Sequence, residues 1–436
     1  MTGIEGLGWA VPRTSITADE YRQALGHFAP RIQEKTLPGY DEDEVTLAVE
    51  AGEHALRACG GDRSIEALAV VSALPVAVST VAEALGLPAA RAKAFGGTDA
   101  GPALLSCLDH AASGQGRALC IAVGTPPRDP GDPAEHGVGT AAVAAVCGRS
   151  GLSRVRSAHA TAEAIATDRG GELARQALDR LAIDAADHVF SNERAPGAAA
   201  FLEKRFGKAV HGGLSWFTGD LGAASALANL AAGAARIQTA QSVVLLTVAP
   251  QSSTAVSFLS EAPLAVSGDL LGSMKRARRY LPFGQHLRRS LASSGNEPSQ
   301  GAYVSPSAYL AELPARYRLV GEACRKCATL HFPPRETCKE CGSREFEPRP
   351  LRRTGKVYTY TVIGRGAAPS EFAEQQAIWG EYATAIVELD DGPRITAMLT
   401  DTDPKTVKTG MPVEMAFRRI YTQEGVARYG FKFRPA

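Results

Sequence analysis

Two pairs of cysteines constrain this chain more than any other feature of its sequence. Cys324 and Cys327 form one Cys-x-x-Cys pair, and Cys338 and Cys341 form a second pair shortly after it. Each pair can place two thiolates on neighbouring corners of a tetrahedron, and a short loop can bring the two pairs together. Four thiolates leave no open coordination position. The sequence therefore predicts a structural zinc site that stabilises the local fold.

Two other uses of paired cysteines explain the pattern less well. A redox dithiol needs only one pair, and iron–sulfur clusters usually show other spacings. His331 lies between the pairs, but four thiolates already complete a tetrahedral shell. We therefore expect the site to serve folding rather than chemistry.

Residues 1–265 alternate between short apolar runs and helical patterns. Helical spacing extends over Asp43–Cys59 and over the alanine-rich stretch Leu221–Ile237. Three runs of strand length are apolar on both faces, as in a sheet covered on both sides: Glu66–Ser72, Ala118–Gly124 and Ser242–Val248. This alternation predicts an α/β domain.

Two passages of this domain resemble each other. Gly96–Ala112 and Gly219–Ala235 each combine a glycine-rich turn with an alanine-rich helix. Similar composition alone can produce such a likeness, so the repeat is a hint rather than a proof. It indicates an internal duplication with halves of about 1–150 and 151–265.

The remaining sequence changes character twice. Residues 266–317 are basic and then polar, and we interpret them as a linker in which the Lys/Arg run is a solvated face or contacts an acidic partner. We expect the zinc ribbon over 318–350. Alternating β-forming residues begin at Val357–Val362, and further short strands follow between turns. We therefore expect a small all-β barrel over 351–436.

Composition excludes several classes of protein. The net charge is +1, whereas a nucleic-acid coat or a membrane-surface protein would carry a basic excess. Four cysteines outside the ribbon are scattered singly, which favours a reducing cytoplasm over a disulfide scaffold. We see no signal peptide and no apolar run long enough to span a membrane. The sequence therefore predicts a cytoplasmic protein that binds neither nucleic acid nor membranes.

Several motifs resemble known families. The stretch Glu34–Ala51 resembles the N-terminal signature of the 3-hydroxy-3-methylglutaryl-CoA (HMG-CoA) synthase family of the thiolase superfamily, which is related to ketoacyl synthase III. The stretch Gly137–Val143 resembles a strand entry of that family. Three stretches of the C-terminal part resemble the zinc-ribbon and OB-fold domain that accompanies thiolase-like proteins: Phe332–Arg335, Gly410–Val413 and Tyr429–Pro435. The resemblance implies a duplicated α-β-α-β-α fold, then a zinc ribbon and an OB-fold barrel.

The same resemblance implies partners. A thiolase-like domain would form a homodimer, or a heteromer with another thiolase-like subunit. It would act on acyl-CoA or acyl-carrier-protein thioesters through a tunnel for CoA or phosphopantetheine. Lys204, Arg205 and Lys208 lie where relatives meet the phosphates of CoA, although exposed lysines on a helix are commonly only solvated.

The residues that perform the family's chemistry are not retained. The family needs a cysteine nucleophile at a helix N-terminus, where the helix dipole lowers its pKa. Thr98 stands at that position, as a weak nucleophile or a helix cap, and Cys107 further along is expected in the core. Ala73 replaces the general acid/base glutamate, and Ser191 replaces the histidine. Pro250 lies in the loop that would offer backbone donors and has no N–H group to offer.

The polar residues left in this region suggest a different acid/base set. Asp220 stands where relatives place an amide, and with Glu193, Ser191, Thr98 and His211 it could form a new site. A buried, unpaired aspartate would have a raised pKa and could act as a base. The alternative is that Asp220 only caps the following helix.

Three functions remain open on these grounds. The first is an enzyme that acts on acyl thioesters without a covalent cysteine intermediate, by aldol, retro-aldol or direct acyl-transfer chemistry. The second is a non-catalytic subunit that pairs with an active thiolase-like enzyme. The third, a single-strand nucleic-acid binder, needs a basic groove with stacking aromatics that the sequence does not indicate. We favour the first narrowly over the second.

Overall fold

The computed structural model divides the chain into two compact units. The first comprises Met1–Pro38 and Asp43–Leu287, and the second comprises Gly39–Glu42 and Arg288–Ala436. The main passage between the units therefore falls inside the segment expected to be a linker. The structure describes residues 2–87, 91–125, 130–161, 170–192, 197–267, 279–292, 303–423 and 425–436.

The large sheet of the first unit is built twice from the same arrangement of strands. Outward from the central contact between β1 and β8, one half runs β1-β7-β6-β4-β5 and the other runs β8-β12-β11-β9-β10. Each strand of one run thus has a counterpart in the other, which confirms the duplication. The strands are β1 Gly3–Ala10, β4 Ile65–Ser72, β5 Ala92–Gly96, β6 Arg117–Gly124, β7 Ala141–Gly148, β8 Leu152–Thr161, β9 His188–Ser191, β10 Val210–His211, β11 Ser242–Ala249 and β12 Ser252–Ser260, with β13 Ala265–Val266 added beside β1.

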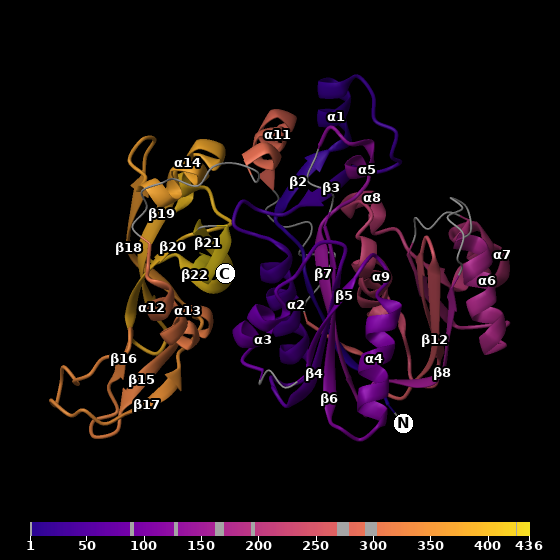
Figure 1. Cartoon of the computed structure of the whole chain (residues 1–436), viewed down its shortest axis with the longest axis horizontal. Coiled ribbons are helices and arrows are strands. Elements are labelled where there is room, and N and C mark those ends of the chain that lie inside the picture. Colours follow the sequence, from indigo (N-terminus) through magenta and orange to yellow (C-terminus); the bar gives the residue numbers. More distant parts are fainter. Residues whose placement is uncertain are drawn as a thin grey trace. The chain divides into compact units, whose positions relative to one another are not determined.

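Helices complete five layers in this unit (Figure 1). One pair covers the outer face of the first half, a second pair covers the outer face of the second half, and a third lies between the halves. The middle helices contact strands of both halves. In that order the pairs are α2 Glu44–Ala58 and α3 Val78–Leu85, α6 Gly170–Leu181 and α7 Ala198–Phe206, and α4 Gly101–Ala112 and α9 Ser225–Gly233. This arrangement confirms the expected α-β-α-β-α fold.

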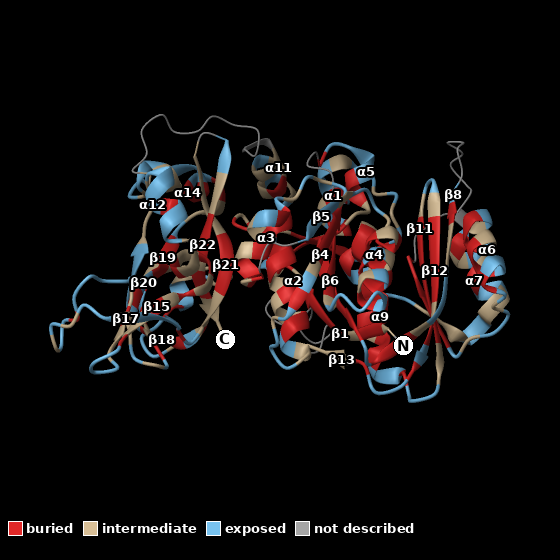
Figure 2. Cartoon of the chain, turned by 60° about the horizontal axis from the view of Figure 1, so that its bottom comes forward, coloured by how far each residue is buried: buried red, intermediate tan, exposed pale blue. Residues whose placement is uncertain are grey.

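The sequence explains the ends of these helices. Asp43 caps α2 by accepting a hydrogen bond from the amide of Thr46, whose side chain accepts one from Asp43 N in return. The single helix expected over Leu221–Ile237 is divided, because the 3₁₀ turns Gly222–Ala224 and Ala234–Arg236 flank α9. Figure 2 shows that buried residues concentrate on the strands and on the helix faces turned toward them.

A small sheet, two short helices and the part of a third helix up to Leu287 surround a buried ion pair in the first unit. The elements are β2 Thr14–Thr17, β3 Glu34–Leu37, β14 Arg279–Tyr280, α1 Ala18–Leu25, α5 Pro133–His136 and α11 Phe283–Ala292. The carboxylate of Glu135 accepts hydrogen bonds from the Tyr21 hydroxyl at 2.7 Å and from Lys35 Nζ, and it lies 3.0 Å from His286 Nε2. All four side chains are buried.

The second unit contains two antiparallel sheets. The ribbon has the order β16-β15-β17, and the barrel has the order β20-β19-β18-β21-β22. A bridge between Leu399 and Phe433 joins the two ends of the barrel. The elements are α12 Pro306–Ala311, α13 Leu313–Arg318, β15 Val320–Cys324, β16 Leu330–His331, β17 Phe346–Pro350, β18 Thr354–Ile363, α14 Ala373–Trp379, β19 Tyr382–Leu389, β20 Arg394–Met398, β21 Pro412–Gln423 and β22 Val426–Pro435. The expected ribbon and OB-fold barrel are both present.

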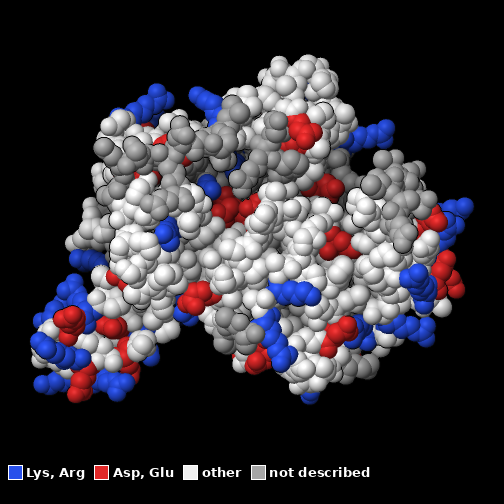
Figure 3. Space-filling view, viewed as in Figure 1, with Lys and Arg blue, Asp and Glu red and all other residues white. Residues whose placement is uncertain are grey.

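The ribbon is polar on its surface. Figure 3 shows Lys and Arg side chains mixed with Asp and Glu side chains at the ribbon end of the molecule, rather than a field of one sign. Among the described helices, none is both long enough and apolar enough to cross a lipid bilayer.

Candidate functional site

The four cysteines of the ribbon converge on one point. Their sulfur atoms all lie within 4.8 Å of one another. Cys324 Sγ lies 3.6 Å from Cys341 Sγ, and Cys327 Sγ lies 3.6 Å from Cys338 Sγ. A tetrahedral ion with metal–sulfur bonds of about 2.3 Å would hold its sulfurs about 3.8 Å apart. The four thiols therefore have the arrangement of a metal site.

Both cysteine pairs are shaped by the same backbone turn. Ala328 N donates to Cys324 O at 2.8 Å, and Gly342 N donates to Cys338 O at 2.9 Å. Ala328 and Gly342 both have a positive φ, of 60° and 71°, so the chain reverses immediately after each pair. The repeated turn aims two sulfurs from each pair at the common point.

His331 supports the metal site from outside the four sulfurs. It is buried on β16, and its Nε2 lies 3.3 Å from Cys338 Sγ. An imidazole N–H at this distance can donate to a thiolate and reduce the charge on the sulfur. This placement fits the expectation that His331 is not itself a ligand.

Asp99 occupies the start of α4, beside the position that the resemblance aligns with the family's nucleophile. Thr98 is exposed there, whereas the carboxylate of Asp99 is fully engaged. It accepts hydrogen bonds from Gly101 N at 2.8 Å, from Thr247 Oγ1 at 2.6 Å and from Ser252 Oγ at 2.5 Å. Because β11 and β12 carry the last two donors, Asp99 fastens the start of α4 to the hairpin of the opposite half.

Side chains of β11 and β12 pack closely against the start of α4. A Cβ atom added to Gly101 would lie 2.2 Å from Thr254 Cβ and 2.6 Å from Thr247 Oγ1. The Thr254 hydroxyl lies 2.8 Å from His159 Nδ1. The start of α4 is thus packed directly against hydroxyl-bearing strands. A change from glycine to any larger residue here would require those strands to shift.

Asp220 precedes the counterpart of α4 in the second half. Its Oδ1 accepts hydrogen bonds from Gly222 N at 3.0 Å and from Ser225 Oγ at 2.8 Å. Its backbone pairs with the loop before β7, where Gly139 N donates to Asp220 O and Asp220 N donates to Gly137 O. The side chain is half-buried. These hydrogen bonds fit the alternative that Asp220 caps the turn before α9.

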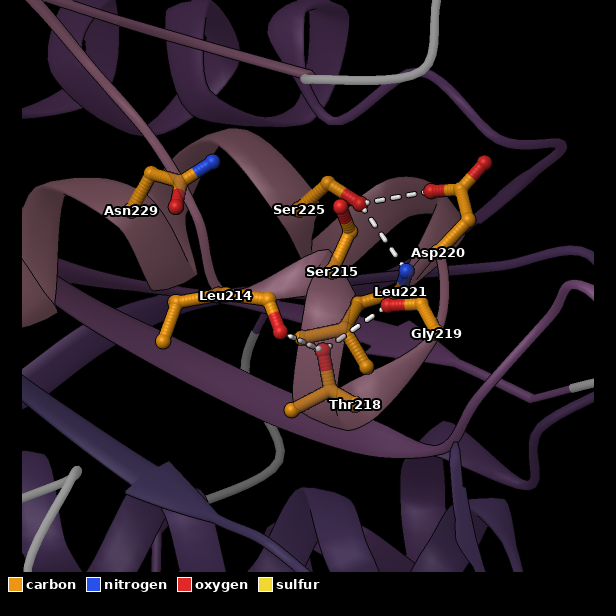
Figure 4. A pocket seen from close by; sticks show the side chains of 8 residues that line it. All are labelled: Leu214, Ser215, Thr218, Gly219, Asp220, Leu221, Ser225 and Asn229. Carbon is orange, nitrogen blue, oxygen red and sulfur yellow. Dashed lines mark hydrogen bonds between the residues drawn. The ribbon is translucent and has the colours of Figure 1, made fainter. Parts of the chain in front are cut away.

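A small hollow lies beside Asp220 (Figure 4). It encloses about 200 Å³ with its open side included, below the roughly 300–1,000 Å³ of typical ligand pockets. The carboxylate oxygen that is not bonded to Ser225 points away from the other labelled side chains. Eight residues line the hollow: Leu214, Ser215, Thr218, Gly219, Asp220, Leu221, Ser225 and Asn229.

The other residues expected beside Asp220 are placed differently. Ser191 is buried at the end of β9, and its carbonyl accepts a hydrogen bond from Asn229 Nδ2 at 2.9 Å. Neither Ser191 nor Thr98 lines the hollow. Glu193 lies outside the described residues. The proposed acid/base set therefore remains a prediction, and Asp220 is its one member placed in the hollow.

His188 and His211 form a pair at the β9–β10 edge of the sheet. His188 Nδ1 lies 2.7 Å from His211 Nε2, and His188 Nε2 lies 2.9 Å from Gln241 Oε1. Burial lowers the pKa of His211, and the neighbouring His188 and Arg236 lower it further. His211 is not among the residues that line the Asp220 hollow.

The three basic residues expected to meet CoA lie at the end of α7. Lys204 and Lys208 are exposed. The guanidinium of Arg205 forms an ion pair with Asp179 at 2.7 Å and donates to Ile183 O at 2.7 Å. Arg205 therefore connects α7 to α6.

Sequence reasoning missed Asp99, although a local signal was present. An aspartate two residues before a helix commonly accepts from the backbone amide at the helix start. The same reasoning placed Cys107 correctly, since it is buried in the core with Cys120 and Cys147. The partners of Asp99 on the opposite half could not be read from sequence.

Comparisons with known proteins identify the second unit. The family model of the ChsH2 rubredoxin-like zinc ribbon domain matches residues 311–347, and that of the ChsH2 C-terminal OB-fold domain matches 348–418. A DUF35 domain-containing scaffold protein of Methanocaldococcus jannaschii is 45% identical over 123 residues, which are 28% of this chain and 83% of that protein. The chain belongs to the DUF35 domain-containing scaffold protein family. A member from Pyrococcus furiosus is 36% identical over 137 residues, covering 31% of this chain and 96% of that protein.

This DUF35 family member also resembles HMG-CoA synthases. The enzyme of Pyrococcus horikoshii is 32% identical over 166 residues, 35% of this chain and 47% of that protein. A crystal structure of HMG-CoA synthase complexed with CoA aligns with a TM-score of 0.56 at 14% identity, over 65% of this chain and 89% of that one. FabH, the 3-oxoacyl-(acyl carrier protein) synthase III of Pseudomonas aeruginosa, aligns with a TM-score of 0.51 at 18% identity, over 60% and 99%. The chain therefore joins a thiolase-like fold to a zinc ribbon and an OB-fold.

Proposed function

We propose that this chain is a non-catalytic thiolase-like subunit, which pairs with an active thiolase-like enzyme acting on acyl-CoA or acyl-carrier-protein thioesters. The observation that carries the proposal is the environment of Asp99. A covalent mechanism needs a nucleophile whose pKa is lowered at the start of α4. Here that helix end is bound to Asp99, and the side chains of Thr247 and Ser252 complete its hydrogen bonds.

The remaining catalytic positions support the same proposal. No cysteine lies at the start of α4, and Thr98 has no base beside it among the contacts described. Ala73 has no titratable group, and Ser191 is a buried strand residue that lies outside the hollow. Replacement of the nucleophile, the acid/base and the histidine together is easier to reconcile with a structural role than with altered chemistry. The relatives from archaea are themselves named scaffold proteins.

The β5 edge is the surface we propose for the partner subunit. Leu68 N donates to Arg91 O, and Gly97 N donates to Ser72 O. In a parallel pair with a period of two, odd-numbered residues of β5 therefore direct their backbone groups toward β4. The even-numbered residues direct theirs outward, and Ala94 is the central one. No other described strand pairs with this side of β5, and most of its residues are exposed. An open edge of this kind is suited to pairing with another chain.

A second candidate is an enzyme that uses Asp220 as a base for aldol, retro-aldol or direct acyl-transfer chemistry. Its support is that Asp220 lines the hollow and that one of its carboxylate oxygens makes no hydrogen bond to the other residues drawn (Figure 4). Lys204 and Lys208 would then be the residues available to CoA phosphates. Against it, the hollow is small for an acyl thioester.

We also propose that the metal of the ribbon is zinc. Four thiolates without an open position suit a structural zinc ion. Cys324, Cys327, Cys338 and Cys341 would be its ligands. Zinc would hold the two cysteine turns together and play no part in acyl chemistry.

Turnover by the purified chain separates the two candidates. The chain would be incubated with acetyl-CoA and acetoacetyl-CoA, and separately with an acyl-loaded carrier protein. Released thiol reports acyl transfer, and mass spectrometry of the thioesters reports aldol and retro-aldol products, which form without release of thiol. We expect neither thiol nor a new thioester above the protein-free control. A product that Asp220→Asn abolishes would overturn the non-catalytic proposal and support the second candidate.

A further inference from the structure

Four residues from the N-terminal part of the sequence lie in the second unit. We call this segment, Gly39–Glu42, the strap. Asp41 Oδ2 accepts hydrogen bonds from Lys432 Nζ at 2.8 Å and from Thr400 Oγ1 at 2.9 Å. Glu42 Oε1 lies 3.0 Å from Arg418 Nη2. The strap thus brings two carboxylates to cations of the barrel.

These cations are unusual because they are buried. Arg418 is 0% exposed and Lys432 is 1% exposed, and the two strap carboxylates are almost as deeply buried. Asp401 contributes the barrel's own carboxylate, 2.9 Å from Arg418 Nη2. Without the strap, Lys432 would lose the carboxylate of Asp41 and Arg418 would lose that of Glu42. Removing one partner of a buried pair costs about 3–5 kcal/mol, because the other charge stays uncompensated. The barrel therefore requires an acidic occupant at this place.

The backbone of the barrel is also shaped for the strap. The register of β21 and β22 shifts between Arg419 and Tyr421, which marks a β-bulge. Beside this bulge Arg419 N donates to Asp41 O at 2.9 Å, and Arg419 Nη2 donates to Tyr40 O at 2.7 Å. The Tyr40 hydroxyl donates to Glu374 at 3.3 Å. Main-chain, side-chain and charge contacts all converge on the same short segment.

We propose that Arg418 and Lys432 form a recognition site for an acidic segment on the OB-fold barrel, and that the strap of this same chain is its occupant. The inference goes beyond the proposed function, because it holds whether or not the first unit is catalytic. In this role, Asp41 and Glu42 hold the strap on the barrel and take part in neither catalysis nor metal binding. The barrel recognises the carboxylates of Asp41 and Glu42 together with two carbonyls of the strap.

Hydrogen exchange of the full chain tests this site at the amides of Glu42 and Arg419. We expect Asp41→Asn and Lys432→Met each to raise exchange at both amides at least tenfold. The double variant should exchange no more than about threefold faster than either single variant, because both changes remove the same interaction. Asp19→Asn is the matched control, since Asp19 is exposed and pairs only with an exposed arginine in the first unit. It should leave both amides unchanged.

Two results would overturn the recognition site. One is unchanged exchange at both amides in Asp41→Asn. The other is a double variant in which the two effects multiply. Because the double variant removes both charges, it also guards against a single variant that unfolds through an uncompensated charge.

Discussion

Residues at the start of α4 make structural contacts. Asp99 accepts one hydrogen bond from the amide of Gly101, the first residue of the helix, and one from each of two hydroxyls of the opposite half. The carboxylate is thereby committed to holding the two halves together.

Asp99→Ala should destabilise the protein by about 2 kcal/mol, because it leaves the Gly101 amide and two hydroxyls without their acceptor. Thr98→Ala is the matched control. Thr98 is exposed, so its change should stay within about 0.5 kcal/mol. Urea unfolding followed by circular dichroism measures both. Equal stabilities for the two variants would show that Asp99 does not fasten α4.

Lys35 gives stability a dependence on pH. Burial lowers its pKa from 10.5 to about 8, although Glu135 acts in the opposite direction. Between these values the unfolded chain holds a proton that the folded chain has released, so stability attributable to Lys35 rises with pH. Burial raises the pKa of Tyr21 as well, and this opposes the trend above its ordinary value of 10.0. The window for Lys35 is therefore pH 8 to 10.

Urea midpoints at pH 7, 8, 9 and 10 test this assignment. The free energy of unfolding of the wild-type protein, minus that of Lys35→Met, should increase from pH 8 to pH 10. The size of this difference at pH 7 does not affect the test. Parallel curves would show that Lys35 keeps an ordinary pKa in the folded state.

At the scale of elements, local sequence signals predicted individual helices, strands and turns. Contacts between distant segments could not be predicted in this way. Asp43 and Cys59 bound α2 as expected, and the three apolar runs form β4, β6 and β11. The cysteine spacing predicted the ribbon because both turns are local. Asp99 and Thr247 are 148 residues apart, and Asp41 and Lys432 are 391 apart. Such pairings follow from the packing of whole elements, which no spacing along the chain encodes.

The ribbon should depend on its metal and on His331. His331→Ala should weaken zinc binding about 10- to 100-fold, as expected for a group that supports a ligand. Competition with a chromogenic chelator measures this affinity. His286→Ala is a control, because that buried histidine lies in the first unit. An unchanged affinity in His331→Ala would show that the contact with Cys338 has no bearing on the metal.

The β5 edge should govern association. Ala94→Pro removes the central outward N–H group without removing a hydrogen bond to β4. We expect it to weaken any self-association or pairing through the first unit at least tenfold. Ala94→Val, which keeps the N–H group, should preserve most of it. Sedimentation velocity over a concentration series measures the effect, and equal association of both variants would exclude this edge.

At the scale of the whole molecule, the chain combines two units. The first has a thiolase-like fold. The second carries four cysteines arranged as a metal site and a barrel that contacts the strap. Under the proposed function, the first unit would supply a complementary fold to another thiolase-like protein.

The most direct test of the central claim is the intact mass of the pure chain after incubation with acetyl-CoA and acetoacetyl-CoA. A non-catalytic subunit should keep an unmodified mass, because no cysteine lies at the start of α4. An acyl adduct that peptide mapping places on Thr98 or Cys107 would contradict it and restore a covalent acyltransferase.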